Sequence, residues 1–155
     1  MTEPVPAATA TNPAIEVRDA ILSMLAAADS LSDLPDGSIR AKLDVSGVPR
    51  GPASVIVSAR DLGNHSGIPG RILVDVQAIV QIMTHLDEDQ DGALADSLMS
   101  AAMAALGGAT AASYSLNGWK VGYPGQWASD EPHIDSDGVF RVCRLSATLF
   151  LQNEL

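Results

Sequence analysis

The sequence predicts a single α+β domain, with a largely antiparallel β-sheet and two main helices packed on one face. Two segments place apolar residues at helical spacing, several others alternate apolar and polar residues, and most strands follow one another without a crossover helix. A chain of 155 residues is long enough to bury one core. We therefore expect a flexible N-terminal arm over residues 1–12 and one domain over residues 13–155.

The first predicted helix begins after Asn12 and runs to about Ala28. Asn is a good helix cap, and Pro13 at the first helical position loses no intrahelical hydrogen bond. The charged residues of this segment are left for solvent. Apolar residues at helical spacing predict its buried stripe, which comprises Ile15, Ile21, Leu22, Leu25 and Ala28.

Three strands are predicted in the middle of the chain. Residues 39–45 alternate between apolar and polar, which predicts a strand with one solvent-exposed face. Residues 53–60 are rich in β-branched residues, which predicts a more buried strand. A glycine-rich loop follows over residues 61–70. Residues 71–85 keep period-two alternation for so long that one long strand is favoured over a helix. Its apolar face would hold Ile72, Val74, Val76, Ala78, Val80 and Ile82.

A second helix is predicted between the acidic segment 87–92 and the pair Gly107–Gly108. Acidic residues favour the positive end of a helix, and glycine is common where a helix ends. Residues 114–122 and 139–152 are the last strand candidates, separated by a long loop. The buried stripe of the second helix would comprise Leu94, Leu98, Ala102 and Leu106.

The net negative charge of the chain argues against a surface that binds nucleic acid. Nine basic and nineteen acidic residues leave a formal charge of −10, which repels phosphate backbones. A local basic patch could still form at Arg40, Lys42, Arg141 or Arg144. No apolar run approaches the roughly 18 residues of a membrane-spanning helix, and the N-terminus lacks the pattern of a signal peptide, so we expect an intracellular protein without a membrane partner.

Two acidic segments are candidate metal sites. Asp87, Asp89 and Asp91 match the start of an EF-hand calcium loop, but Leu98 occupies the position that needs a bidentate Glu. We interpret this segment as an acidic helix start, with calcium as the alternative. The second segment contains Glu131, His133 and Asp135. We interpret it as a hydrogen-bonded turn, with a zinc site as the alternative.

No pattern in the sequence indicates catalysis. The single cysteine, Cys143, has no CxxC neighbour and is expected to be a buried thiol in a strand. There is no phosphate-binding glycine loop and no GxSxG elbow. We therefore expect no enzyme activity, no catalytic, cofactor-binding or metal residues, and no cofactor.

Aromatic residues are concentrated in one late segment of a chain that is only 4% aromatic. Large aromatic side chains supply much contact area and are enriched at binding hot spots. The segment is therefore a candidate partner surface, although Trp119 would fill the core if it belongs to a strand. The interface residues of this hypothesis are Trp119, Tyr123, Trp127 and His133.

The order of these elements resembles that of the tail terminator, or tail-completion, proteins of long-tailed bacteriophages. The resembling parts are helix 15–28, strand 71–85 (RILVDVQAIVQIMTH), the helix after Asp91 and the closing segment 138–151 (GVFRVCRLSATLFL).

The resemblance implies a structural virion protein that is assembled in the host cytoplasm. It would form a homo-hexameric ring that caps the tail tube and joins it to the head-side neck. Its partners would be other copies of itself, the tail tube protein and a neck connector protein. DNA would pass through the lumen without specific binding, which the acidic balance of the chain suits.

Two alternatives remain open. One is another phage neck or head-completion connector protein, and the other is a cytoplasmic small-ligand-binding or enzymatic α+β domain. A ring would favour the virion proteins, whereas a stable monomer with a deep polar pocket would favour the cytoplasmic domain.

Overall fold

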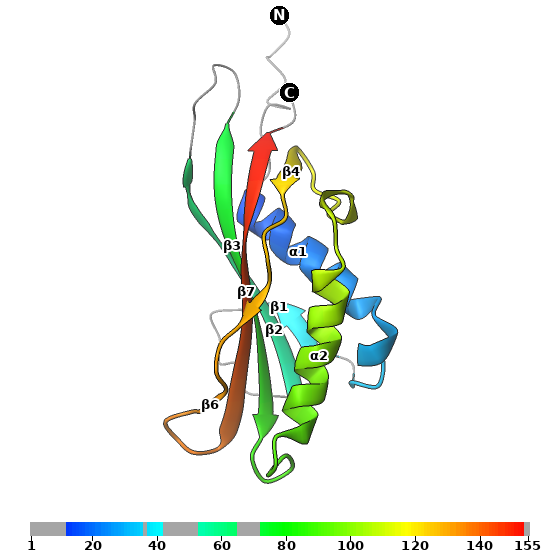
Figure 1. Cartoon of the computed structure of the whole chain (residues 1–155), viewed down its shortest axis with the longest axis vertical. Helices are drawn as coiled ribbons and strands as arrows, with labels where there is room; N and C mark the ends of the chain where they lie inside the picture. Colours follow the sequence, from blue (N-terminus) through cyan, green and yellow to red (C-terminus); the bar gives the residue numbers. More distant parts are fainter. Residues whose placement is uncertain (1–11, 36, 42–52, 65–71, 154–155) are drawn as a thin grey trace, which may run out of the picture.

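A computed structural model describes residues 12–35, 37–41, 53–64 and 72–153 (Figure 1). Three predicted segments lie outside these residues. They are the arm before Asn12, the end of the first strand including Lys42, and the tip of the glycine-rich loop. The described helices are α1 (Pro13–Ala26) and α2 (Ala93–Gly107), with short 3-10 helices η2 (Asp29–Leu31) and η3 (Ala111–Ser113). The described strands are β1 (Ile39–Ala41), β2 (Ala53–Asn64), β3 (Leu73–His85), β4 (Trp119–Tyr123), β5 (Ala128–Ser129), β6 (His133–Ile134) and β7 (Phe140–Asn153).

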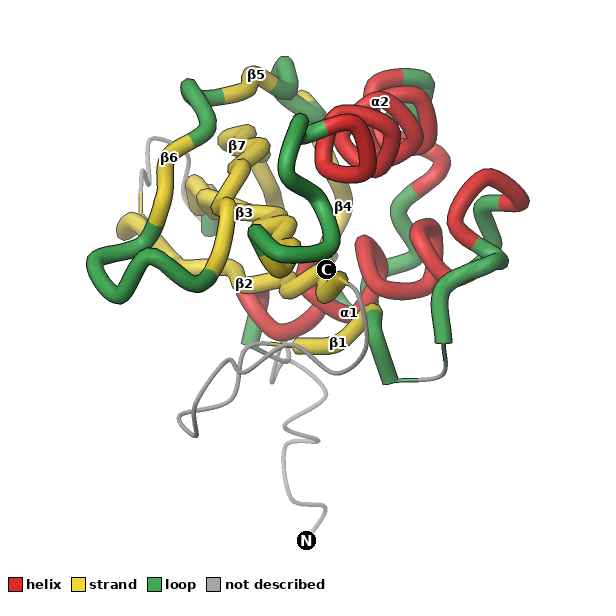
Figure 2. The backbone as a smooth tube through the Cα atoms, turned by 90° about the horizontal axis from the view of Figure 1, so that it is seen from below, coloured by secondary structure: helices red, strands yellow, loops and turns green. Residues whose placement is uncertain are grey.

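The described strands form one sheet in the order β1-β2-β3-β7-β4, with β5 and β6 also paired to β7. Strand β1 runs parallel to β2, and the other pairings are antiparallel. Helices α1 and α2 lie on the same face of this sheet (Figures 1 and 2). The predicted α+β fold with a largely antiparallel sheet and helices on one face is therefore confirmed.

Strands β3 and β7 form the centre of the sheet and carry most of the core. Their side chains alternate between the two faces, as the pleat of a strand requires. The predicted apolar face of β3 is confirmed from Val74 to Ile82, while Ile72 lies before the strand and is 44% exposed. On β7 the buried face comprises Cys143, Leu145, Ala147, Leu149 and Leu151.

Helix α1 is capped by Asn12, whose Oδ1 accepts hydrogen bonds from the backbone N–H groups of Ala14 and Ile15. The helix buries a stripe of residues spaced by four, namely Val17, Ile21 and Leu25. The prediction that Ile15 belongs to this stripe was wrong. Ile15 is 43% exposed because a residue two positions before Val17 points to the opposite side of a helix.

Helix α2 confirms Leu98, Ala102 and Leu106 as its buried stripe, with Ala95 joining them and Leu94 only partly buried. The strand predicted from residue 114 begins instead at Trp119. The 3-10 helix η3, with a reciprocal cap between its N-cap Thr110 and Ser113, carries the chain from the end of α2 towards the sheet edge. The predicted long loop contains β5 and β6, which were not anticipated because each has two residues.

Candidate interaction surface

The aromatic segment lies along one edge of β7. Strands β4, β5 and β6 pair in turn with different parts of β7, so the segment forms an interrupted edge strand of the sheet. Trp119 is 6% exposed and belongs to the core, which is the alternative that the sequence left open for it. Tyr123 is 57% exposed on β4, and His133 is exposed on β6. Trp127 is half-buried and packs against the core.

Trp127 also borders a small cavity between the end of α2 and the segment before β5. The cavity has a volume of about 280 Å³, and Met103, Leu106 and Gln126 contribute to its lining. Trp127 therefore contacts the core and also lines this cavity. The four residues of the interface hypothesis do not share one surface, and Tyr123 and His133 are its exposed members.

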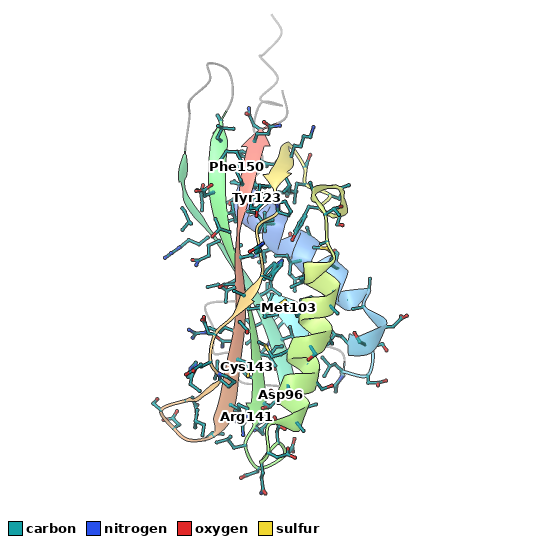
Figure 3. The ribbon with its side chains drawn as sticks, viewed as in Figure 1. Asp96, Met103, Tyr123, Arg141, Cys143 and Phe150 are labelled. Atoms are coloured by element: carbon teal, nitrogen blue, oxygen red, sulfur yellow. The ribbon has the colours of Figure 1, made fainter. Side chains whose placement is uncertain are left out.

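Gly125 allows the edge strand to lie close to β7. Gly125 has φ +73°, and a Cβ there would overlap the backbone carbonyl oxygen of Thr148. At Gly122 a Cβ would lie 3.4 Å from Cδ1 of Phe150, which is ordinary van der Waals contact. Tyr123 pairs with Phe150 across the strands, and both lie near the same end of β7 (Figure 3).

The face of the sheet turned away from the helices, which we call the open face, carries exposed side chains such as Arg60, Arg144 and Thr148, while Ser54, Ile56 and Val142 on the same face are buried. Strand alternation places Arg60 and Gln77 there in one row with Thr148, and Gln81 with Arg144 in another. Nη2 of Arg60 donates to Oε1 of Gln77 at 3.3 Å, and Nε of Arg144 donates to Oε1 of Gln81 at 3.0 Å. Both guanidinium groups are thus oriented by neutral glutamines.

Arg141 was considered with Arg144 as part of a local basic patch, but the structure separates the two. Arg141 pairs with Thr84 on the opposite face, and its Nη2 donates to the carbonyl oxygens of Asp89 and Gln90. Its guanidinium also packs against Gly92. Arg141 therefore supports the turn before α2 and is not available to the open face.

The acidic segment before α2 is a helix start, as we interpreted it from the sequence. Asp89 is 2% exposed, and its carboxylate accepts hydrogen bonds from the hydroxyl of Thr84 and from the N–H groups of Leu94 and Ala95. Burial alone would raise the pKa of Asp89, but these hydrogen bonds and the charge of Arg141 outweigh it and lower the pKa. The Asp89 carboxylate is thereby committed to the protein itself.

The second acidic segment forms a hydrogen-bonded turn. Oδ1 of Asp135 accepts from the backbone N–H groups of Val139 and Phe140, which closes the connection from β6 to β7. His133 and Glu131 are exposed. Within the described ranges no three His, Cys, Asp or Glu side chains are grouped so that they could hold a metal ion.

Cys143 is a buried residue of β7, as predicted. Burial raises the pKa of its thiol, and the negative charge of Asp96 raises the pKa further. A thiol with a raised pKa remains protonated at neutral pH and is a poor nucleophile. Its position on the inner face, beside α2, gives Cys143 a packing role (Figure 3).

A groove lies on the helical side, between α1 and the segment around η3. Its volume is about 370 Å³, and its lining includes Glu16, Asp19, Ser23 and Met24. Oε1 of Glu16 accepts a hydrogen bond from the backbone N–H of Asn117 at 2.7 Å, which ties α1 to the chain that leads into β4. The lining of the groove therefore combines acidic side chains with apolar ones.

No protein-family model and no curated protein sequence matches this chain. Among solved structures, the chain is similar to one from the virion of a native gene transfer agent (GTA) particle. The TM-score is 0.65 at 13% sequence identity, and the match covers 90% of this chain and 96% of that chain. The two chains share a fold over nearly their whole length. No described helix is long and apolar enough to cross a membrane.

Proposed function

We propose that this protein is a structural subunit of a virion tail, and that it acts by assembly and not by catalysis. The observation that carries the proposal is the fold shared with a chain of a virion particle, which spans 90% of this chain and 96% of that one. The element order that resembles tail terminators is also retained in the structure, from α1 through the long strands to β7.

Within that class, we propose that the protein forms a homo-hexameric ring that caps the tail tube and joins it to the head-side neck. Its binding partners would be the tail tube protein, a neck connector protein and further copies of itself. The cavity beside Trp127 and the groove beside α1, at about 280 and 370 Å³, are at the small end of the range for ligand sites. Extended surfaces are therefore better candidates for function than these pockets.

Deleting the gene from a particle-producing strain tests the terminator role. A cap that stops polymerisation determines tail length, so its loss should give tails of variable and excessive length that are not joined to heads. Electron micrographs of the particles would measure both effects, and expression of the intact chain from a plasmid should restore uniform, joined tails.

The same images separate the alternatives. Uniform tails that lack only the attachment to heads would favour a neck or head-completion connector. Particles that are normal in number, tail length and infectivity would contradict a virion role altogether. Labelling the intact particle with an antibody against this chain should place it in several copies at the head-side end of the tail.

A further inference from the structure

Most basic residues that the structure describes lie on one face of the sheet. Strand register and alternation place four basic residues on the open face, while Arg18 and Arg141 are the described basic residues that lie elsewhere. Among the long strands the same alternation places one acidic residue there, Asp75, and Asp130 follows β5 opposite Arg144, to whose carbonyl oxygen its backbone N–H donates. The basic residues of the open face are Arg40, Arg60, Lys120 and Arg144.

The helical side has the opposite charge. Arg18 is the basic residue of the described helices, and its Nη2 lies 3.0 Å from Oδ1 of the adjacent Asp19. Glu16 and Asp19 line the groove beside α1, whereas Asp29 and Asp33 lie in and just after η2, and Asp96 lies in the first turn of α2.

The open face also presents partly exposed apolar groups among its charges. Phe150 and Ile79 are half-buried there, and Tyr123 is 57% exposed beside Phe150. Aromatic residues and arginine are enriched at protein interfaces, where an apolar centre is bordered by polar groups. The groove on the helical side is lined by Met24 together with Glu16 and Asp19, so it also combines an apolar side chain with charged ones.

We propose that the open face of one copy docks onto the acidic helical side of a second copy of this chain. The two surfaces lie on opposite sides of the sheet, so one molecule cannot satisfy both by itself (Figures 1 and 2). Their complementary charges favour this pairing and oppose contact between two like faces. The contact is heterologous, and repeated contacts of this kind close into a ring when the rotation permits. The inference rests on the proposed ring assembly and identifies the surfaces that form it.

Cross-linking between introduced cysteines tests the pairing in the full-length protein. Ser23→Cys lies in the groove and Thr148→Cys lies on the open face, and both positions are exposed. The native Cys143 is 1% exposed and should not react. With a short bismaleimide, a chain carrying both changes should give a ladder of covalent oligomers, while each single variant should remain uncross-linked. Efficient dimers of Thr148→Cys alone would overturn the proposal, because they require two open faces to meet.

Charge reversal provides a second, independent readout. Asp19→Arg and Arg60→Glu should each weaken self-association by about tenfold, since each places like charges across the contact. A chain carrying both substitutions should regain most of the lost affinity, because the pair is restored with reversed signs. Sedimentation velocity at several salt concentrations would measure the effect. Asp137→Arg makes the same charge change in the β6–β7 turn and serves as the matched control.

The outcomes separate this inference from the proposed function. Rings on tails that give no Ser23–Thr148 cross-link and no rescue by the double charge reversal would overturn the docking geometry while leaving the ring intact. Particles that contain this chain as a single isolated copy would overturn both.

Discussion

Asp89 is a buried carboxylate that joins strand β3 to the start of helix α2. It accepts hydrogen bonds from Thr84 at 2.9 Å and from the N–H groups of Leu94 and Ala95 at 2.8 and 3.0 Å. Nε of Arg141 lies 3.9 Å from Oδ2 of Asp89, so β7 contributes to the same cluster. The Asp89 side chain thus joins β3 to α2 through charge-assisted hydrogen bonds and reaches β7 through this ion pair.

Asp89→Asn should destabilise the protein by about 2–4 kcal/mol, because the amide removes the charge and turns a donor towards groups that need an acceptor. Urea unfolding would measure the loss. The control is Asp91→Asn, since Asp91 is exposed and bonds only locally, to the N–H of Ala93. Equal stability of the two variants would contradict a structural role for Asp89.

The lowered pKa of Asp89 also makes a pH prediction. A carboxyl group whose folded pKa lies below its ordinary value of 3.8 stabilises the protein above that pH. This contribution is lost as the pH falls through the folded pKa. The stability difference between the native protein and Asp89→Asn should therefore be largest near neutral pH and shrink below about pH 4. A stability difference that grows as the pH falls would contradict a lowered pKa for Asp89 in the folded protein.

Trp119 and Tyr123 lie at the two ends of β4 and should behave differently when replaced by alanine. Trp119 is 6% exposed in the core, so Trp119→Ala should cost about 3–5 kcal/mol of stability. Tyr123 is 57% exposed, so Tyr123→Ala should change stability by less than about 0.5 kcal/mol while weakening assembly. Thermal unfolding and sedimentation of the same samples would test both effects. Assembly unaffected in Tyr123→Ala would remove this residue from the interface.

At the scale of elements, the edge strand β4–β6 depends on close approach to β7. Gly125 combines φ +73° with backbone contact to the carbonyl group of Thr148. Gly125→Ala should therefore cost about 2–3 kcal/mol and expose the amides of residues 126–129 to hydrogen exchange. Gly138→Ala is the matched control, because φ is +69° but no atom lies within 4 Å of the added Cβ. If both variants lose equal stability, the contact with β7 contributes nothing beyond the backbone strain.

The turn between β3 and α2 should not require calcium. The segment resembles the start of a calcium loop, yet Asp89 is committed to capping the helix and Leu98 is buried in its stripe. Melting temperatures in millimolar calcium and in excess chelator should therefore agree. An increase of many degrees on adding calcium would show that the turn rearranges into a metal site.

At the scale of the whole molecule, the basic open face must act against a formal charge of −10. Long-range repulsion of phosphates is expected to exceed the attraction of a few arginines at physiological salt. Duplex DNA should bind weakly or not at all under these conditions. Fluorescence anisotropy over a salt series would test this, and a sub-micromolar, salt-sensitive complex would assign the open face to nucleic acid.

The fold class followed from local patterns that tertiary contacts did not override. The alternation from Val74 to Ile82 identified a long strand, and Asn12 followed by Pro13 located the start of α1. The acidic helix start was also recognisable, because capping is governed by neighbouring residues. Local signals were too short for β5 and β6, whose two-residue strands exist only because β7 lies beside them.

The sequence by itself determined the α+β class, the two helices, the long central strands and the excess of negative charge. Tertiary structure alone decided which aromatic side chains are exposed, that Arg141 points inward, and that Arg60 and Arg144 share one face. Periodicity records which residues of one element point the same way, since it depends on backbone geometry within that element. The pairing register between strands distant in sequence decides which of those residues become neighbours, and a candidate interaction surface is built from such neighbours.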